Sequence, residues 1–155
     1  MQPLTRRWSK ELGVPVFCID YRQPPAFQFP TAVEDCFNVY QFITQHIHNY
    51  FNIRPKNIVL AGDSAGGNLA CSLEALILKN KIIAPKGMLL AYPAADVRQR
   101  YSPSRLNAFN DGILFPSFLL LCLREYLGKN IENQFHPLAS PVLLSEKFVN
   151  ENSED

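Results

Sequence analysis

The sequence lacks the features that mark several large classes of protein. Its 15 Lys and Arg residues nearly balance 14 Asp and Glu residues, and the formal net charge is only +1. Such a balance gives no electrostatic reason to expect a nucleic acid as partner. The longest apolar stretch, residues 113–123, is interrupted by Pro116 and Ser117 and is too short to span a bilayer. We therefore expect neither a nucleic-acid partner nor a transmembrane segment.

Cysteine is also scarce, and no C-x-x-C pair is present. Cys18, Cys36, Cys71 and Cys122 lie far apart, and three of the four sit in apolar patterns. Residues 1–13 have no apolar h-region of the kind that a secretory signal needs, so an oxidising compartment is not expected. The sequence predicts reduced cysteines, mostly in the core, in a soluble protein of the cytoplasm.

Three short apolar runs have the character of strands buried on both faces, as in parallel sheets. They cover residues 13–20, 57–63 and 87–93. Helical patterns separate them, and strands that alternate with helices of this length predict βαβ units. We find no internal repeat, and residues 150–155 are polar and expected to be a disordered tail.

The helical patterns carry start and stop signals. Thr31 and Glu34 have the spacing of a capping box and open a helix expected to end near Phe51. A second helix is expected after Ser64, and a third from Pro116 to a stop at Gly128. The apolar stripes of the first two helices contain Phe37, Tyr40, Ile43 and Ile47, and Leu69, Leu73, Leu76 and Ile77.

The second apolar run leads directly into the sequence GDSAG, Gly62 to Gly66, which fits the G-x-S-x-G pattern. Between a buried strand and a helix, this pattern predicts a tight turn that presents Ser64 as a nucleophile. Gly62 and Gly66 would leave room for the turn, and the N–H of Ala65 would face the substrate oxygen. Asp63 and Gly67 complete the predicted elbow. The alternative is a glycine-rich turn that binds phosphate or closes a loop, but the P-loop and G-x-G-x-x-G patterns are absent.

Further segments accompany this turn in a fixed order. GDSAGGN with DYR and FP upstream, and YPA and SPSR downstream, resembles the hormone-sensitive lipase family of α/β hydrolases. Residues 102–128 make the chain more similar to the lipase that gives the family its name than to the family's small bacterial esterases. The similarity runs from about Trp8 to about Phe148.

This resemblance implies an α/β-hydrolase fold, a three-layer arrangement with a mostly parallel sheet and helices on both faces. It also implies ester hydrolysis in lipid catabolism through a serine acyl-enzyme. Candidate substrates are acylglycerols, sterol esters and short-chain esters, and peripheral contact with lipid droplets or membranes is a further implication. By the same resemblance Ser64 is the nucleophile, the Ala65 N–H is an oxyanion donor, and Asp20 and Tyr21 shape the site. The family usually has a glutamate where this chain has Ala26.

A serine nucleophile needs a base and an orienting acid, which in this fold follow the serine as acid and then histidine. His136 is the only histidine after Ser64, and it lies in a block that matches a structural segment of the family. Of the acids after Ser64, Asp96 and Asp111 lack the strand-end context of the family's aspartate, and Asp111 is the least poor candidate. We therefore expect neither the triad acid nor the triad histidine in this chain.

No metal or other cofactor is expected. His46 and His48 precede Ser64 at a spacing of i, i+2, which puts them on different faces of a helix and makes a shared metal improbable. Glu34 and Asp35 are interpreted as first-turn acids that the helix dipole favours.

The family's His-Gly-Gly-Gly loop and the strand before it would precede Trp8 and are not in the sequence. In the family that strand lies between the runs 13–20 and 57–63. We therefore expect residues 1–149 to be a partial, central piece of a catalytic domain with little esterase activity alone. The alternatives are a non-catalytic binding or receptor protein on the same fold, and a truncated gene product.

Overall fold

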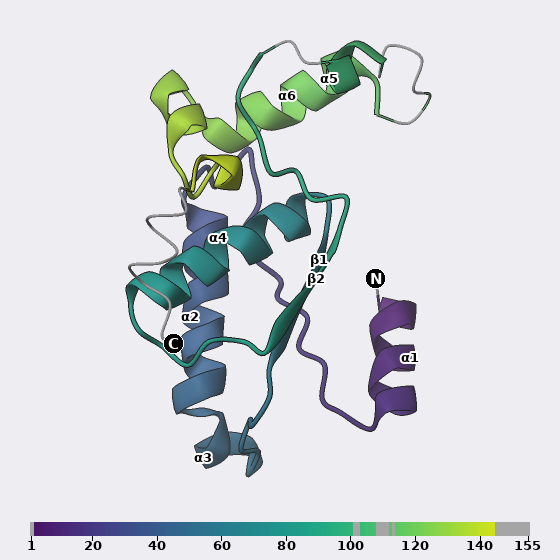
Figure 1. The fold of residues 1–155 in the computed structure, drawn as a ribbon, viewed down its shortest axis with the longest axis vertical. Coiled ribbons are helices and arrows are strands. Elements are labelled where there is room, and N and C mark those ends of the chain that lie inside the picture. Colours follow the sequence, from purple (N-terminus) through teal and green to yellow (C-terminus); the bar gives the residue numbers. More distant parts are fainter. Residues whose placement is uncertain (1, 101–102, 108–111, 113, 145–155) are drawn as a thin grey trace.

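The computed structural model describes residues 2–100, 103–107, 112 and 114–144. Figure 1 shows two strands seen edge-on, with α2 and α4 on one side of them and α1 on the other. The helices are α1 Gln2–Leu12, α2 Thr31–Gln45, α3 Ile47–Phe51, α4 Ala65–Lys79, α5 Pro103–Asn107, α6 Pro116–Leu127 and the 3₁₀ turns η2 Ile131–Phe135 and η3 Pro141–Leu143; the strands are β1 Val59–Asp63 and β2 Gly87–Ala91. The predicted tail, residues 150–155, lies outside the described residues.

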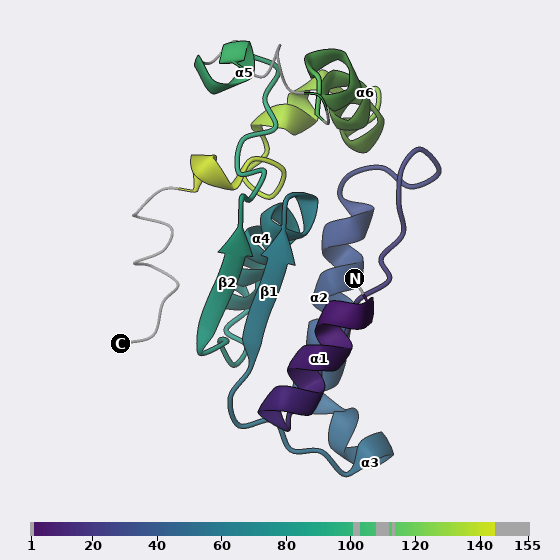
Figure 2. The same cartoon turned by 90° about the vertical axis from the view of Figure 1, so that its right-hand side faces the viewer.

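The two strands are parallel neighbours joined through α4, so they form the predicted βαβ unit. Val59 pairs with Gly87 and Asp63 with Ala91, which places both carboxyl ends at one edge of the sheet. Figure 2 shows that this edge faces the layer containing α5 and α6. The strand predictions for 57–63 and 87–93 are confirmed.

The third predicted strand, residues 13–20, is wrong. These residues have no strand assignment, although the segment beyond Gly13 is free of helix. A strand exists only where a neighbour supplies backbone hydrogen bonds, and in the described part of the chain β1 and β2 pair only with each other. The apolar side chains of this run are buried only in part: Ile19 packs against the core, whereas Phe17 is exposed.

The main core lies between α2 and α4 and on the sheet face that α4 covers. Its buried members are Ala32, Val33, Cys36, Tyr40, Leu69, Leu73 and Ile77. Leu60 of β1 packs against this cluster. Successive strand residues point to opposite faces, so Val59 of β1 and Leu89 of β2, which share the face opposite to that of Leu60, point away from α4. Val59 is 63% exposed and Leu89 56% exposed, so that face of the sheet is largely uncovered.

The helix that begins at Thr31 differs from its prediction at both ends. Pro30 is the N-cap, Thr31 is the first helical residue, and no side chain caps the helix, so the capping-box assignment is wrong. The helix also breaks at His46, whose φ of −123° leaves the helical region. A short α3 then continues to Phe51, where the single predicted helix was expected to end. Asp35, interpreted as a first-turn acid, instead forms an ion pair that is described with the site.

The start and stop signals of α6 are confirmed. Pro116 occupies the first turn after the N-cap Phe115, and Gly128 follows the helix with a φ of 74°. The positive φ favours glycine at this position, and the nearest neighbour of a Cβ there would be the end of the flexible Gln28 side chain, which can move aside. The Phe29 N–H donates to the carbonyl of Tyr126 at 2.7 Å, which ties the end of α6 to the loop before α2.

All four cysteines are free, as predicted, but only Cys36 is in the core. Cys18 and Cys122 are exposed and Cys71 is half-buried. Burial raises the pKa of the Cys36 thiol to about 11, with a smaller contribution from Asp35. Among the described residues, no helix is both long enough and apolar enough to cross a membrane.

The side chain of Glu74, in α4, has a carboxylate oxygen that is buried without a hydrogen-bond partner among the described residues. This oxygen is Oε2. Burial raises the pKa of the Glu74 carboxyl above its ordinary value of 4.5. Because the pKa of Glu74 is higher in the folded than in the unfolded chain, its carboxyl does not lower the free energy of unfolding at pH values below the ordinary pKa. The free energy of unfolding falls as pH rises through the folded value. Glu74→Gln is therefore expected to stabilise the chain at about pH 8 by up to about 1 kcal/mol, and by nothing at about pH 4. Urea unfolding at both pH values measures this; an equal difference at both would contradict it.

Candidate active site

Ser64 lies between the last residue of β1 and the first residue of α4, at the carboxyl edge of the sheet. Its backbone has φ 50° and ψ −115°, a conformation that non-glycine residues rarely adopt. The residue is exposed. Strained backbone of this kind persists only where the surroundings hold it, and it clusters at functional sites.

The backbone of Ser64 is held from three sides. Its N–H donates to the carbonyl of Ala91 at 3.0 Å. Its carbonyl accepts from the N–H groups of Ala94 and Asn68, each at 3.1 Å. The end of β2 and the loop after it therefore hold both backbone groups of Ser64, while α4 starts from the same residue.

Two glycines make this turn possible, and only one of them, Gly62, is among the two that the sequence predicted to be crowded. A Cβ at Gly62 would lie 2.3 Å from the carbonyl oxygen of Gly66, and one at Gly67 would lie 2.8 Å from Cβ of Pro93. A Cβ at Gly66 would meet nothing within 4 Å. The prediction that the turn leaves no room at Gly66 is therefore wrong for this chain, because that position faces open space. The crowding falls on Gly62 and Gly67.

Ala65 is the first residue of α4. The first four N–H groups of a helix have no acceptor within the helix, and the helix dipole favours negative charge there. The N–H of Ala65 therefore belongs to a group of donors suited to an anion beside Ser64. Asp63, at the other side of Ser64, is the last residue of β1 and is half-buried.

The Asp-Tyr-Arg segment reaches this turn through Tyr21. Burial raises the pKa of the Tyr21 phenol, and smaller contributions come from Cys36 and from Asp63. Tyr21 also packs against the main core, whereas the side chain of Asp20 is exposed. Ala26, which stands where the family usually has a glutamate, is exposed in the following turn. Of the two predicted supporting residues, Tyr21 thus lies close enough to Asp63 for their charges to interact, and Asp20 has no described contact with the elbow.

Arg22 fastens this segment to α2. Its Nη2 donates to Oδ1 of Asp35 at 2.7 Å and its Nε to Oδ2 at 3.0 Å, and the Arg22 backbone N–H donates to Oδ2 at 3.0 Å. The hydrogen bonds from the Arg22 side chain are the main cause that lowers the pKa of Asp35. A bidentate pair of this geometry fixes orientation as well as position.

A chain of buried polar side chains behind the turn was not foreseen from the sequence. Asn68 and Ser72 lie on the core side of α4, and Gln134 and Ser140 lie in the C-terminal block. Ser140 Oγ accepts from the Val97 N–H at 3.1 Å, and Gln134 Oε1 accepts from the Gln99 N–H at 2.8 Å. The signal was present in the sequence, because Asn68 and Ser72 interrupt the apolar stripe of α4 at the positions before Leu69 and Leu73.

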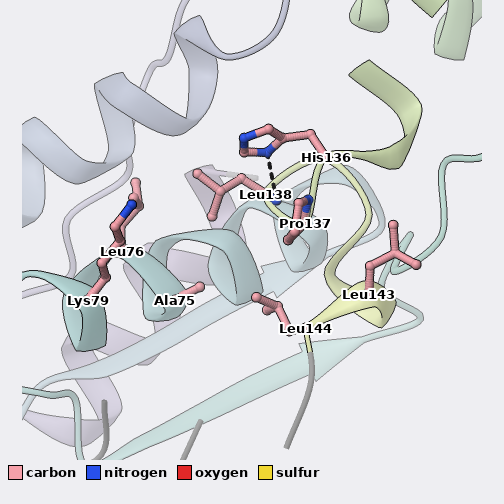
Figure 3. A pocket seen from close by; sticks show the side chains of 8 residues that line it. All are labelled: Ala75, Leu76, Lys79, His136, Pro137, Leu138, Leu143 and Leu144. Carbon is pink, nitrogen blue, oxygen red and sulfur yellow. Dashed lines mark hydrogen bonds between the residues drawn. The ribbon is translucent and has the colours of Figure 1, made fainter. Parts of the chain in front are cut away.

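His136 and Asp96, which follow Ser64 in the sequence, form interactions with residues other than Ser64. Nδ1 of His136 accepts from the Leu138 N–H at 3.1 Å, and Figure 3 shows the ring beside a pocket of about 320 Å³ along the C-terminal half of α4. Ser64 is at the opposite end of that helix. Asp96 forms ion pairs with Arg98 and Arg100, and hydrogen bonds from the Arg98 side chain are the main cause of its lowered pKa. Asp111 lies outside the described residues.

The two histidines before Ser64 are remote from it as well. His46 is exposed at the junction of α2 and α3, and Nε2 of His48 lies 3.1 Å from Nη2 of Arg54. Over the part of the chain that the structure describes, no group of three or more His, Cys, Asp or Glu residues is placed to hold a metal ion.

The sequence profile of the alpha/beta hydrolase fold matches residues 1–151. The chain belongs to this family. Hormone-sensitive lipase of Mus musculus is 37% identical to this chain over 134 residues, which are 86% of the chain and 18% of the lipase. Arylacetamide deacetylase of Oryctolagus cuniculus is 31% identical over an alignment of 160 positions, which covers 97% of the chain and 40% of that enzyme.

Solved esterases share the architecture of this chain. The Pyrobaculum calidifontis esterase superposes with a TM-score of 0.85 at 27% identity and covers 93% of the chain. Carboxyl esterase 2 of Tuber melanosporum superposes with a TM-score of 0.86 at 26% identity and covers 96%. The chain spans 47% of each of those structures and under half of the curated relatives described above. The predicted fold and family are confirmed.

Proposed function

We propose that this chain supplies the nucleophile of a carboxylic ester hydrolase. The observation that carries the proposal is the strained, exposed Ser64 at the start of α4. Its Oγ attacks the carbonyl carbon of an ester, the Oγ proton passes to a base, and the alcohol leaves. The N–H of Ala65 stabilises the negative charge that develops on the carbonyl oxygen. Water then attacks the acyl-enzyme and releases the carboxylic acid.

The base and its orienting acid are proposed to come from residues other than those described here. His136 and Asp96 are engaged elsewhere, and neither forms a described hydrogen bond with Ser64. Without a base, serine is a weak nucleophile, so we expect the 155-residue chain alone to have little turnover. A binding protein on the same fold has no need to keep a backbone strained at an exposed serine, which favours the catalytic reading.

The substrates are proposed to be esters with an acyl chain, as acylglycerols, sterol esters or short-chain esters, handled in lipid catabolism. This rests on the likeness to hormone-sensitive lipase and to the esterases. A cytoplasmic location and peripheral contact with lipid droplets or membranes also belong to the proposal. Fluorescence microscopy of the tagged protein in lipid-loaded cells tests both.

The direct test is hydrolysis of p-nitrophenyl acetate, butyrate and decanoate. The chain is assayed alone and again after extension by the sequence that flanks its reading frame in the genome. We expect turnover by the extended protein and little by the chain alone. Failure of the extended protein to hydrolyse any of these esters would contradict the enzymatic function. Turnover by the chain alone would contradict only the proposed origin of the base and the acid.

A further inference from the structure

The first turn of α4 carries a buried amide that the proposed reaction does not use. Asn68 is 3% exposed, and its Nδ2 donates to the carbonyl of Ala94 at 2.7 Å and to that of Ala139 at 2.8 Å. A side-chain amide nitrogen has two N–H groups. Both are therefore committed, each to a backbone segment distant in sequence from α4.

One of these segments is the loop that holds Ser64. The N–H of Ala94 donates to the Ser64 carbonyl while the carbonyl of Ala94 accepts from Asn68. At the other end of the loop, the Ala91 carbonyl accepts from the Ser64 N–H. Gly67 lets the loop come this close, since a Cβ there would lie 2.8 Å from Cβ of Pro93. Residues 91–94 thus touch both backbone groups of Ser64, and Asn68 fastens the loop to α4.

We propose that Asn68 is a positioning residue for Ser64, an inference that rests on the proposed function. It makes no contact with substrate and acts through the loop 91–94. Without its amide, the buried Ala139 carbonyl and the half-buried Ala94 carbonyl lose this donor, and polar groups left unpaired away from water drive local rearrangement. The loop then shifts, and the strained backbone of Ser64 relaxes because its surroundings no longer determine it. The oxygen of Ser64 leaves its place beside the N–H of Ala65.

Ser72 is a matched control one turn further along α4. It is fully buried, and its Oγ lies 2.7 Å from the Leu138 carbonyl and 3.0 Å from the Asn68 carbonyl. It helps to hold the same C-terminal block as Asn68 but has no described contact with residues 91–94. Ser72→Ala therefore reports the damage from losing a buried hydrogen bond behind α4 while the loop at Ser64 keeps its partners.

The experiment compares Asn68→Ala and Ser72→Ala in this chain by amide hydrogen exchange and by covalent labelling of Ser64. We expect Asn68→Ala to lower the protection of the Ala94 amide at least about tenfold more than Ser72→Ala does. The rate at which a fluorophosphonate labels Ser64 should fall about tenfold in Asn68→Ala and less than about twofold in Ser72→Ala. In the extended, active protein the same split should appear in kcat, with KM unchanged.

Equal protection of Ala94 in the two variants, or unchanged protection in Asn68→Ala, would overturn the proposal. If Asn68→Ala does not fold, Asn68→Leu fills a similar volume without any donor, and wild-type protection of Ala94 in that variant would overturn the proposal instead. If the wild-type chain and the extended protein show neither labelling nor turnover, the proposed function fails. Hydrogen exchange at Ala94 still decides whether Asn68 holds the loop.

Discussion

Replacing Ser64 with alanine is expected to abolish ester hydrolysis by the extended protein, with kcat lowered by at least about 10⁴-fold. Oγ of Ser64 is the atom that forms the covalent bond to the acyl group, so a variant without it has no nucleophile at the turn. The fold should survive, because alanine keeps the Cβ and the same backbone strain, and both backbone groups of Ser64 retain their partners. Hydrolysis of p-nitrophenyl butyrate, followed in parallel with circular dichroism, measures both effects.

Ser117→Ala is the control for this substitution. Ser117 is exposed on α6 and has no described role at the turn, so its loss should leave kcat within about twofold of the wild-type value. If Ser64→Ala keeps more than about one tenth of the wild-type kcat, the hydrolysis does not pass through an acyl-enzyme at this residue.

Gly62→Ala is expected to be the most destabilising single substitution in the turn, with a loss of about 3 kcal/mol or more. The new Cβ would lie 2.3 Å from the carbonyl oxygen of Gly66 and 2.8 Å from the N of Gly67. These are backbone atoms in the first turn of α4, so they cannot move aside as a flexible side chain would. Relief of the clash must separate β1 from the start of α4, which is the contact that forms the turn. Urea unfolding followed by tryptophan fluorescence and circular dichroism measures the loss.

Gly66→Ala is the matched control, since it makes the same chemical change at a position with nothing within 4 Å. Gly66 is inside α4, where alanine is the better helix former by about 1 kcal/mol. In this chain Gly66→Ala should therefore be neutral or stabilising. If Gly66→Ala lowers the free energy of unfolding more than Gly62→Ala does, the conclusion that Gly62 is crowded and Gly66 is not would be wrong.

Local sequence patterns correctly predicted the helices and strands that are determined by residues close to them in the sequence. An apolar run followed by G-x-S-x-G predicted β1, the turn and α4, and Pro116 and Gly128 predicted the bounds of α6. The run 13–20 failed as a strand because a strand depends on a neighbour that its own sequence does not specify. Thr31 failed as a cap because the N-cap position is one residue earlier, at Pro30, and Thr31 is the first helical residue, although the T-x-x-E spacing is real.

The site shows the same division. The pattern predicts Ser64 at the turn and crowding at Gly62 and Gly66, but the crowding at Gly67 depends on the position of Pro93, which the pattern does not specify. Asn68 was part of the quoted motif, yet its role needs the position of Ala94, which is 26 residues away. Asp35 pairs with Arg22 across 13 residues, and no helix periodicity predicts such a contact.

The claim at the centre of this account is that the fold singles out Ser64 among the serines of the chain as the site of acyl transfer. Peptide mapping by mass spectrometry after incubation with a fluorophosphonate tests it most directly. We expect the adduct on Ser64, forming slowly in this chain because the base is not among the described residues, and absent in Ser64→Ala. An adduct that forms on another serine at the same or a greater rate, or one that persists in Ser64→Ala, would contradict the account.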